Sequence, residues 1–229
     1  MTLARLLPIV VLASCSTFES TSSSDAGTTA PTTAKSCQEL LANDASLRSK
    51  NGVYEITPAA GKPSIKVYCN MSLADGGWTM VGRSGQFAPG GAQSFGWTHA
   101  TGDVADEQYP YSLDVVANAI SFKLVLVSDR EGAHAYEFPV PPDFLSHTKD
   151  VISTGTVKSV GEIPCVGKDG PPDMVKFVGA VALDDIFWLR DVQDLGQERG
   201  LTPKGFDMSY DDCPRGGLLN GLQGAIFVK

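Results

Sequence analysis

Hydrophobic residues follow two distinct patterns along this chain. Near its start, residues 6–13 form an apolar run that only Pro8 interrupts, behind a single basic residue, Arg5. Beyond residue 35, apolar and aromatic residues stand in short alternating runs, separated by plentiful glycine and proline. Alternation with a period of two is typical of strands. The sequence therefore predicts many short strands and long loops, with little helix.

The clearest helix signal lies at the beginning of the second region. Ser36, followed three residues later by Glu39, forms a capping box that marks the first turn of a helix. The apolar face of this helix is expected to include Leu40, Leu41 and Leu47. We therefore expect a short helix that packs on the core of the domain.

Strands are expected after a turn signal at Asn51-Gly52. The expected strands cover residues 53–56, 65–69, 121–127 and 224–228. The third of these alternates in the period of a strand, with Phe122, Leu124 and Leu126 on one face and Lys123, Val125 and Val127 on the other.

The apolar run at the start has the length of a signal peptide core. It is shorter than the roughly 20 residues that a membrane-spanning helix needs. Leu12-Ala13-Ser14-Cys15 follows it and resembles the lipobox of bacterial lipoproteins. That resemblance implies a signal peptide of residues 1–14, cut before Cys15, whose thiol receives a diacylglycerol anchor. The alternative is an ordinary signal peptide with an incidental cysteine. Ser16 after the cysteine favours the outer membrane or cell surface.

The rest of the chain divides into a tether and one domain. Residues 15–35 are rich in Ser, Thr, Ala and Gly, a composition that predicts a disordered linker behind the lipid. Residues 36–229 have the length of a single domain and contain no internal repeat. The net charge of −8 and the pI near 4.8 disfavour nucleic acid as a partner, because a phosphate backbone would be repelled. Cations or neutral ligands suit an acidic exported protein better.

Four cysteines remain once Cys15 is assigned to lipid. An even number in an exported domain predicts two disulfides, and three pairings are open. A zinc site is the competing interpretation, but no two of these cysteines have the close spacing of zinc ligands. The four residues are Cys37, Cys69, Cys165 and Cys213.

Four motifs in the first part of the domain occur in a specific order. They are Ser36-Cys37-Gln38-Glu39-Leu40-Leu41, Asn51-Gly52-Val53-Tyr54-Glu55-Ile56-Thr57-Pro58, Val67-Tyr68-Cys69-Asn70-Met71 and Asp75-Gly76-Gly77-Trp78-Thr79-Met80-Val81. This series resembles the opening of the fibrinogen-like domain of fibrinogen, ficolins, tenascins and, in part, intelectins. The resemblance implies an α+β fold with a short N-terminal helix, twisted mostly antiparallel sheets and long loops. It also implies a Cys37–Cys69 disulfide, which would contribute roughly 3–4 kcal/mol by closing its loop.

The resemblance weakens further along the chain. Residues 121–138 resemble the central hairpin of the family. Residues 86–113 lack its F-W-L-G-N-E motif and contain Phe95-Gly96-Trp97 instead. We therefore interpret the chain as a divergent bacterial branch of the family.

The C-terminal part contains the candidate metal site. In the family an acidic loop binds calcium before a cysteine, and Asp207, Asp211 and Asp212 stand before Cys213 here. Carboxylate oxygens are the ligands that Ca²⁺ prefers. The competing interpretation is a solvated acidic turn, and the family's second cysteine and its histidine have no counterpart here. Asp184-Asp185 is a weaker second candidate.

No catalytic motif occurs in the sequence, so we do not expect an enzyme. There is no nucleophile elbow, no H-E-x-x-H pair and no phosphate-binding glycine loop. The first functional hypothesis is a membrane-tethered binding module that recognises glycans or acetylated groups, with Ca²⁺ as its candidate cofactor. The alternative is a structural lipoprotein that interacts with envelope or extracellular proteins and has no small-ligand pocket. The sequence does not identify the ligand-binding residues of either.

The lipobox prediction can be tested on the mature protein. Mass spectrometry of its N-terminus is expected to find Cys15 as the first residue, with a diacylglycerol on the thiol. An unmodified N-terminus at any other residue would contradict the lipid anchor and leave only export.

Overall fold

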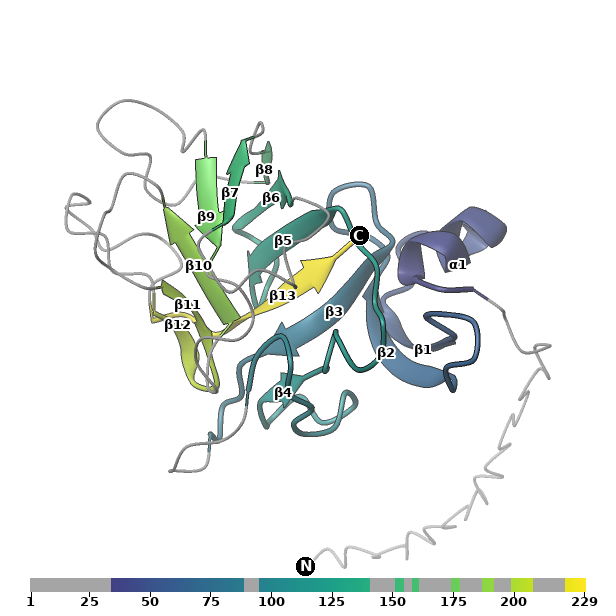
Figure 1. The fold of residues 1–229 in the computed structure, drawn as a ribbon, viewed down its shortest axis with the longest axis horizontal. Helices are drawn as coiled ribbons and strands as arrows, with labels where there is room; N and C mark the ends of the chain where they lie inside the picture. The colour runs from purple at the N-terminus through teal and green to yellow at the C-terminus, as the bar shows by residue number, and fades with distance from the viewer. Residues whose placement is uncertain are drawn as a thin grey trace, which may run out of the picture. The chain divides into compact units, whose positions relative to one another are not determined.

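A computed structural model gives the fold of the domain (Figure 1). The structure describes residues 34–88, 95–140, 151–154, 158–160, 174–177, 187–191, 199–207 and 221–229. All of them belong to one compact unit, residues 31–229. None of the helices in these ranges is long and apolar enough to cross a membrane.

The described elements are mostly strands. The helical elements are α1 (Cys37–Asn43) and the single 3₁₀ turn η1 (Ala45–Leu47). The strands of the first half are β1 (Gly52–Ile56), β2 (Ile65–Asn70), β3 (Trp78–Arg83), β4 (Tyr111–Ser112), β5 (Leu124–Asp129) and β6 (Ala135–Pro139). The later strands are β7 (Val151–Thr154), β8 (Lys158–Val160), β9 (Met174–Phe177), β10 (Phe187–Asp191), β11 (Arg199–Thr202), β12 (Gly205–Asp207) and β13 (Gly224–Val228).

The described strands form two sheets, and every pairing between them is antiparallel. The larger sheet has the order β1-β2-β3-β13-β5-β6-β8, with β4 also paired to β3. The smaller sheet has the order β12-β11-β10-β9-β7. Figure 1 shows the last strand, β13, between β3 and β5. The prediction of mostly antiparallel sheets with one short helix near the start is confirmed.

The helix begins where its capping signal places it. Ser36 is the N-cap, and its hydroxyl accepts the Glu39 N–H at 3.2 Å. The Glu39 carboxylate accepts the N–H of Lys35, not that of Ser36 as in a complete capping box. Leu40 and Leu41 are buried as predicted. The prediction was wrong for the third leucine, Leu47, which lies in η1 because the helix ends at Asn43.

A disulfide joins the helix to the larger sheet. Cys37 at the start of α1 is bonded to Cys69 on β2, with the two Cα atoms 5.5 Å apart. Both residues are fully buried. The pairing implied by the family resemblance is therefore present. The other predicted disulfide cysteines, Cys165 and Cys213, lie outside the described residues.

Aromatic rings form the core against the centre of the larger sheet. Phe187 contacts Phe95 and Trp97 edge to face, with centroids 5.1 and 4.9 Å away. Trp97 also stacks on Phe122. The Phe187 ring lies so close to Gly82 on β3 that a Cβ there would overlap it. Phe95 and Trp97, from the segment that lacks the F-W-L-G-N-E motif, therefore form much of this core.

Strand β5 is buried on both faces. Val125, Leu126 and Val127 are each at most 1% exposed. The sequence predicted a strand from residue 121, whereas β5 begins at Leu124. Its neighbours in the sheet are β13 on one side and β6 on the other.

Two glycines shape the turn into β3. Gly76 and Gly77 have φ angles of 70° and 76°, a conformation that side chains disfavour. A Cβ on Gly76 would overlap the carbonyl oxygen of Met71, and a Cβ on Gly77 would lie 2.9 Å from the Cα of Gln38. The chain enters β3 at Trp78, which is fully buried.

This geometry predicts a large difference between two glycine-to-alanine substitutions. Gly76→Ala should lower the free energy of unfolding by about 3 kcal/mol or more, because a left-handed alanine costs about 1–2 kcal/mol and the overlap adds to it. Gly61→Ala is the matched control, since Gly61 has φ 78° but no atom within 4 Å of its Cβ position. It should cost only about 1 kcal/mol. Urea unfolding measures both values, and equal losses would contradict the steric argument.

Candidate functional site

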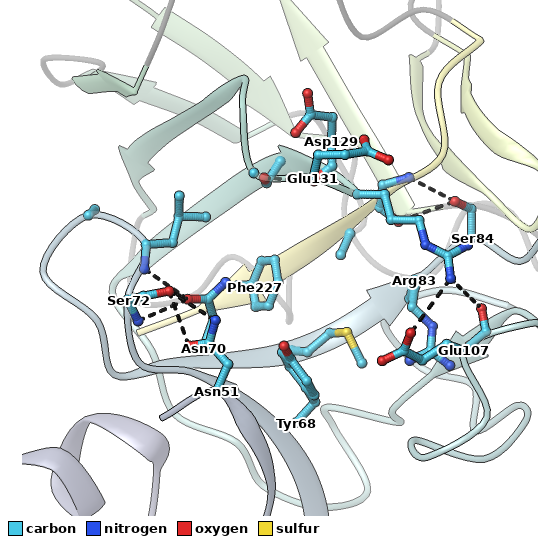
Figure 2. Close-up of a pocket in the computed structure, with 18 residues that line it drawn as sticks. Asn51, Tyr68, Asn70, Ser72, Arg83, Ser84, Glu107, Asp129, Glu131 and Phe227 are labelled. Carbon is cyan, nitrogen blue, oxygen red and sulfur yellow. Dashed lines mark hydrogen bonds and ion pairs between the residues drawn. The ribbon is translucent and has the colours of Figure 1, made fainter. Parts of the chain in front are cut away.

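A cavity of about 410 Å³ lies on one face of the larger sheet. Figure 2 shows its three parts. Asn51, Asn70 and Ser72 stand at one end, Arg83 and Glu107 at the other, and Asp129 and Glu131 along one side. Phe227 lies between them.

The floor consists of side chains in neighbouring positions on adjacent strands. Met80 on β3 pairs with Phe227 on β13, and both are buried. In the next row Arg83 on β3 pairs with Ala225 on β13, which in turn pairs with Ser128 on β5. Met80 and Arg83 are three residues apart and would lie on opposite faces of a regular strand. The register shift opposite Ile226 and Phe227 brings both onto the face that carries Phe227 and Ala225.

Arg83 connects the floor to the loop of residues 103–109. Its guanidinium donates to the carbonyl oxygens of Val104 at 3.2 Å, Asp103 at 3.4 Å, Asp106 and Tyr109. Burial lowers the pKa of this arginine, and the negative charge of nearby carboxylates opposes the shift. The side chain is thus a buried cation that four backbone oxygens stabilise.

The Tyr111 ring lies against the same guanidinium. The Arg83 Cζ is 6.0 Å from the ring centroid, a cation–π distance. Burial raises the pKa of Tyr111 to about 12, although the positive charge of Arg83 acts in the opposite direction. Tyr111 is therefore a neutral structural partner of the arginine at physiological pH.

Arg130 forms the wall nearest to the 103–109 loop. Its guanidinium donates to Gln223 Oε1 at 3.0 Å and to the Glu107 carbonyl at 3.3 Å. It also lies 3.7 Å from the Glu107 carboxylate. Gln223 in turn donates to the carbonyl of Gly85. The ion pair is exposed and contributes at most about 1 kcal/mol, so these contacts serve mainly to position the wall.

Asp129 borders the cavity at the end of β5, and its side chain is buried. It is 5% exposed, and its Oδ2 accepts the backbone N–H of His134 at 3.1 Å. Its Oδ1 accepts no hydrogen bond within the described part of the chain. Carboxylates at a hairpin turn are usually solvated, but Asp129 is buried and accepts the N–H of a residue at the other end of the turn. Glu131 is exposed.

The opposite end of the cavity is a neutral hydrogen-bonded network. Asn51 accepts the Met71 N–H at 2.7 Å and donates to the Ser72 hydroxyl at 2.9 Å. Asn70 Oδ1 accepts the N–H groups of Leu73 at 2.8 Å and Ser72 at 3.1 Å. These bonds fix the loop that forms the rim. They use the Asn70 carbonyl oxygen and leave its amide N–H groups available.

Tyr68 on β2 also lines the cavity and is partly buried. Burial raises the pKa of its phenol, and the negative charge of Glu107 adds to the shift. The positive charge of Arg83 acts in the opposite direction. The hydroxyl consequently stays protonated at neutral pH and can donate a hydrogen bond to a ligand.

The sequence did not identify this cavity. The motif that contains Tyr68 and Asn70 indicated the fold of the domain and not a ligand site. One signal was present: Arg83 ends an otherwise apolar strand segment, and such a charge in a central strand requires partners.

Most of the predicted metal and lipid residues cannot be placed on the fold. Asp207 is the last residue of β12. The others lie outside the described residues, namely Cys15, Asp184, Asp185, Asp211 and Asp212. Within the described ranges, no three His, Cys, Asp or Glu side chains are grouped so that they could hold a metal ion.

Comparisons with known proteins give a partial similarity in structure. No protein-family model matches the sequence, and no curated protein matches it. Among solved structures, the chain is similar to the fibrinogen-like globe domain of human ANGPTL6. The TM-score is 0.36 at 20% identity, over 55% of this chain and 57% of that domain. The chain thus spans little more than half of the matched domain.

Proposed function

We propose that this protein is a membrane-tethered, extracytoplasmic binding module of fibrinogen-like type, with the cavity on the larger sheet as its ligand site. The observation that carries the proposal is the construction of that cavity. Its volume of about 410 Å³ lies within the range of small-molecule sites, which hold about 300–1,000 Å³. It combines an apolar floor with polar groups on several sides, as ligand sites do.

The positions of the walls are fixed before any ligand arrives. The Asn51–Ser72 network holds one rim, and Arg130 holds the other through Gln223 and Glu107. A site that is already ordered loses little conformational entropy on binding. Both donors and acceptors line the cavity around the Phe227 ring, a combination that suits a polar ring such as a sugar, or an acetylated group.

The tether gives the module its place in the cell. A lipid on Cys15 would hold it at the outer membrane or cell surface, and residues 16–35 would act as a flexible leash. The module could then reach a glycan or another extracellular partner beyond the membrane. The alternative, a structural envelope lipoprotein that binds only proteins, would leave this cavity without a function.

A cavity-filling substitution tests the ligand site. Ala225→Leu places a larger side chain on the floor and is expected to reduce glycan binding at least tenfold on an array of the mature protein. Leu73→Trp, at the partly buried rim, is a second variant if the first one folds poorly. The control is Glu55→Gln, an exposed change on β1 that should have no effect. A blank array for the unsubstituted protein, together with capture of an envelope protein in pull-downs, would favour the structural alternative.

We also propose calcium at Asp207, Asp211 and Asp212, for which the motif before Cys213 is the support. Millimolar Ca²⁺ should raise the unfolding temperature, since a hundredfold excess over Kd stabilises a protein by about 2.7 kcal/mol. Mg²⁺ is the control cation, and Asp211→Asn should remove the effect. An unfolding midpoint that Ca²⁺ does not change would contradict the metal site without affecting the cavity.

A further inference from the structure

We infer that the ligand of the cavity is an oligosaccharide, and that one of its outer sugar rings stacks on an exposed pair of aromatic side chains, Phe87 and Tyr109. The inference rests on the proposed function, because it extends the same ligand site. Its basis is the exposure of this pair, the contacts that fix its position and its place beside one end of the cavity.

The two rings of the aromatic pair contact each other and are nevertheless open to solvent. Their centroids are 6.2 Å apart, at an interplanar angle of 48°. Phe87 is 52% exposed and Tyr109 is 46% exposed, and they are the aromatic members of the exposed large hydrophobic residues in the described part of the chain. Single apolar residues on a surface are common, but adjacent exposed rings are typical of a binding surface.

Backbone contacts hold the aromatic pair in place. The Phe87 N–H donates to the Gln108 carbonyl at 3.0 Å. The Tyr109 carbonyl accepts a hydrogen bond from the buried Arg83 guanidinium at 3.5 Å. Gly85 packs so tightly against the same segment that a Cβ there would lie 2.5 Å from the Tyr109 carbonyl carbon. The rings are therefore carried on ordered backbone, so stacking on them costs little conformational entropy.

The aromatic pair continues from the end of the cavity at which Glu107 stands. Tyr109 is the second residue after Glu107, so their Cα atoms are at most about 7 Å apart. Gln223 connects the wall of the cavity to the other half of the pair. It accepts a hydrogen bond from Arg130 at 3.0 Å and donates one at 3.1 Å to the carbonyl of Gly85, just before the phenylalanine. A ligand that leaves the cavity over this end therefore reaches the rings.

The groups between the cavity and the aromatic pair suit a sugar chain more than an apolar protein surface. The Glu107 and Arg130 side chains are 67% and 36% exposed and neutralise one another. They offer acceptors and donors to hydroxyl groups without favouring a charged ligand. A sugar ring combines hydroxyls at its edge with a C–H face, which the negative face of an aromatic ring attracts. An apolar protein surface would instead desolvate this ion pair without replacing its hydrogen bonds.

Isothermal titration of the mature full-length protein in detergent tests the inference. The probes are glucose and N-acetylglucosamine, each as the monomer and as its β-1,4-linked tetramer. A tetramer should bind at least tenfold more tightly than its monomer. Phe87→Ala and Tyr109→Ala should each remove most of this gain and leave monomer binding and the unfolding midpoint unchanged, because both side chains are exposed. Tyr109→Phe keeps the ring and should keep the gain. Val53→Ala, which truncates another exposed apolar side chain, is the matched control and should change nothing.

The possible failures are distinguishable. Equal binding of tetramer and monomer, lost from both in Ala225→Leu, would overturn the inference but support the cavity as the ligand site. If the advantage of the tetramer survives in both alanine variants, the aromatic pair is not part of the site. Capture of an envelope protein that Phe87→Ala abolishes, without any preference for a tetramer, would assign the pair to a protein interface instead. No binding of any probe would overturn the inference, and a glycan array that is also blank would count against the proposed function itself.

Discussion

The position of the last strand is the constraint on which the rest of the structure depends. β13 pairs with β3 on one side and β5 on the other, so the final residues of the chain join strands that lie far earlier in the sequence. Without it, β1–β3 with β4 and the group of β5, β6 and β8 would be two separate sheets in the described part of the chain. A shift of register between Ile226 and Phe227 lets β13 match both neighbours. Since such long-range pairing requires the closure of large loops, it must form late and cooperatively.

The same register creates the cavity and determines which charges are buried there. Ala225, the small residue of the row, stands between Arg83 and Ser128 and leaves space above the sheet. The buried Arg83 guanidinium donates to backbone carbonyl oxygens of the 103–109 loop. These bonds stabilise its charge and hold the loop in place. Asp129 has much less compensation, with a single N–H from His134 on one oxygen. The two buried residues thus differ in their partners: Arg83 holds a loop through four backbone oxygens, and Asp129 holds the β5–β6 turn through one N–H.

Local sequence signals predicted the elements whose partners are close in the chain. The capping residues of α1, the strands around Val67 and Trp78 and the Cys37–Cys69 disulfide all lie within one segment of the sequence and its family resemblance. The burial of both faces of β5 was not predictable, because it depends on β13, a strand far away in sequence. The burial of Asp129 was hidden for a similar reason, since a carboxylate in a hairpin turn is usually solvated. The partners of Arg83 are backbone carbonyl oxygens, which every residue has, so the sequence could not indicate them.

Selection for stability alone would not retain Asp129. Replacement of a buried, incompletely paired carboxylate by a neutral residue of the same shape is often neutral or stabilising, so a purely structural turn would gain from asparagine at this position. Asparagine would preserve the acceptor for the His134 N–H and would also tolerate the turn. The one bond to the Asp129 carboxylate within the described part of the chain comes from the His134 N–H, so the turn depends on the acceptor oxygen and not on the charge.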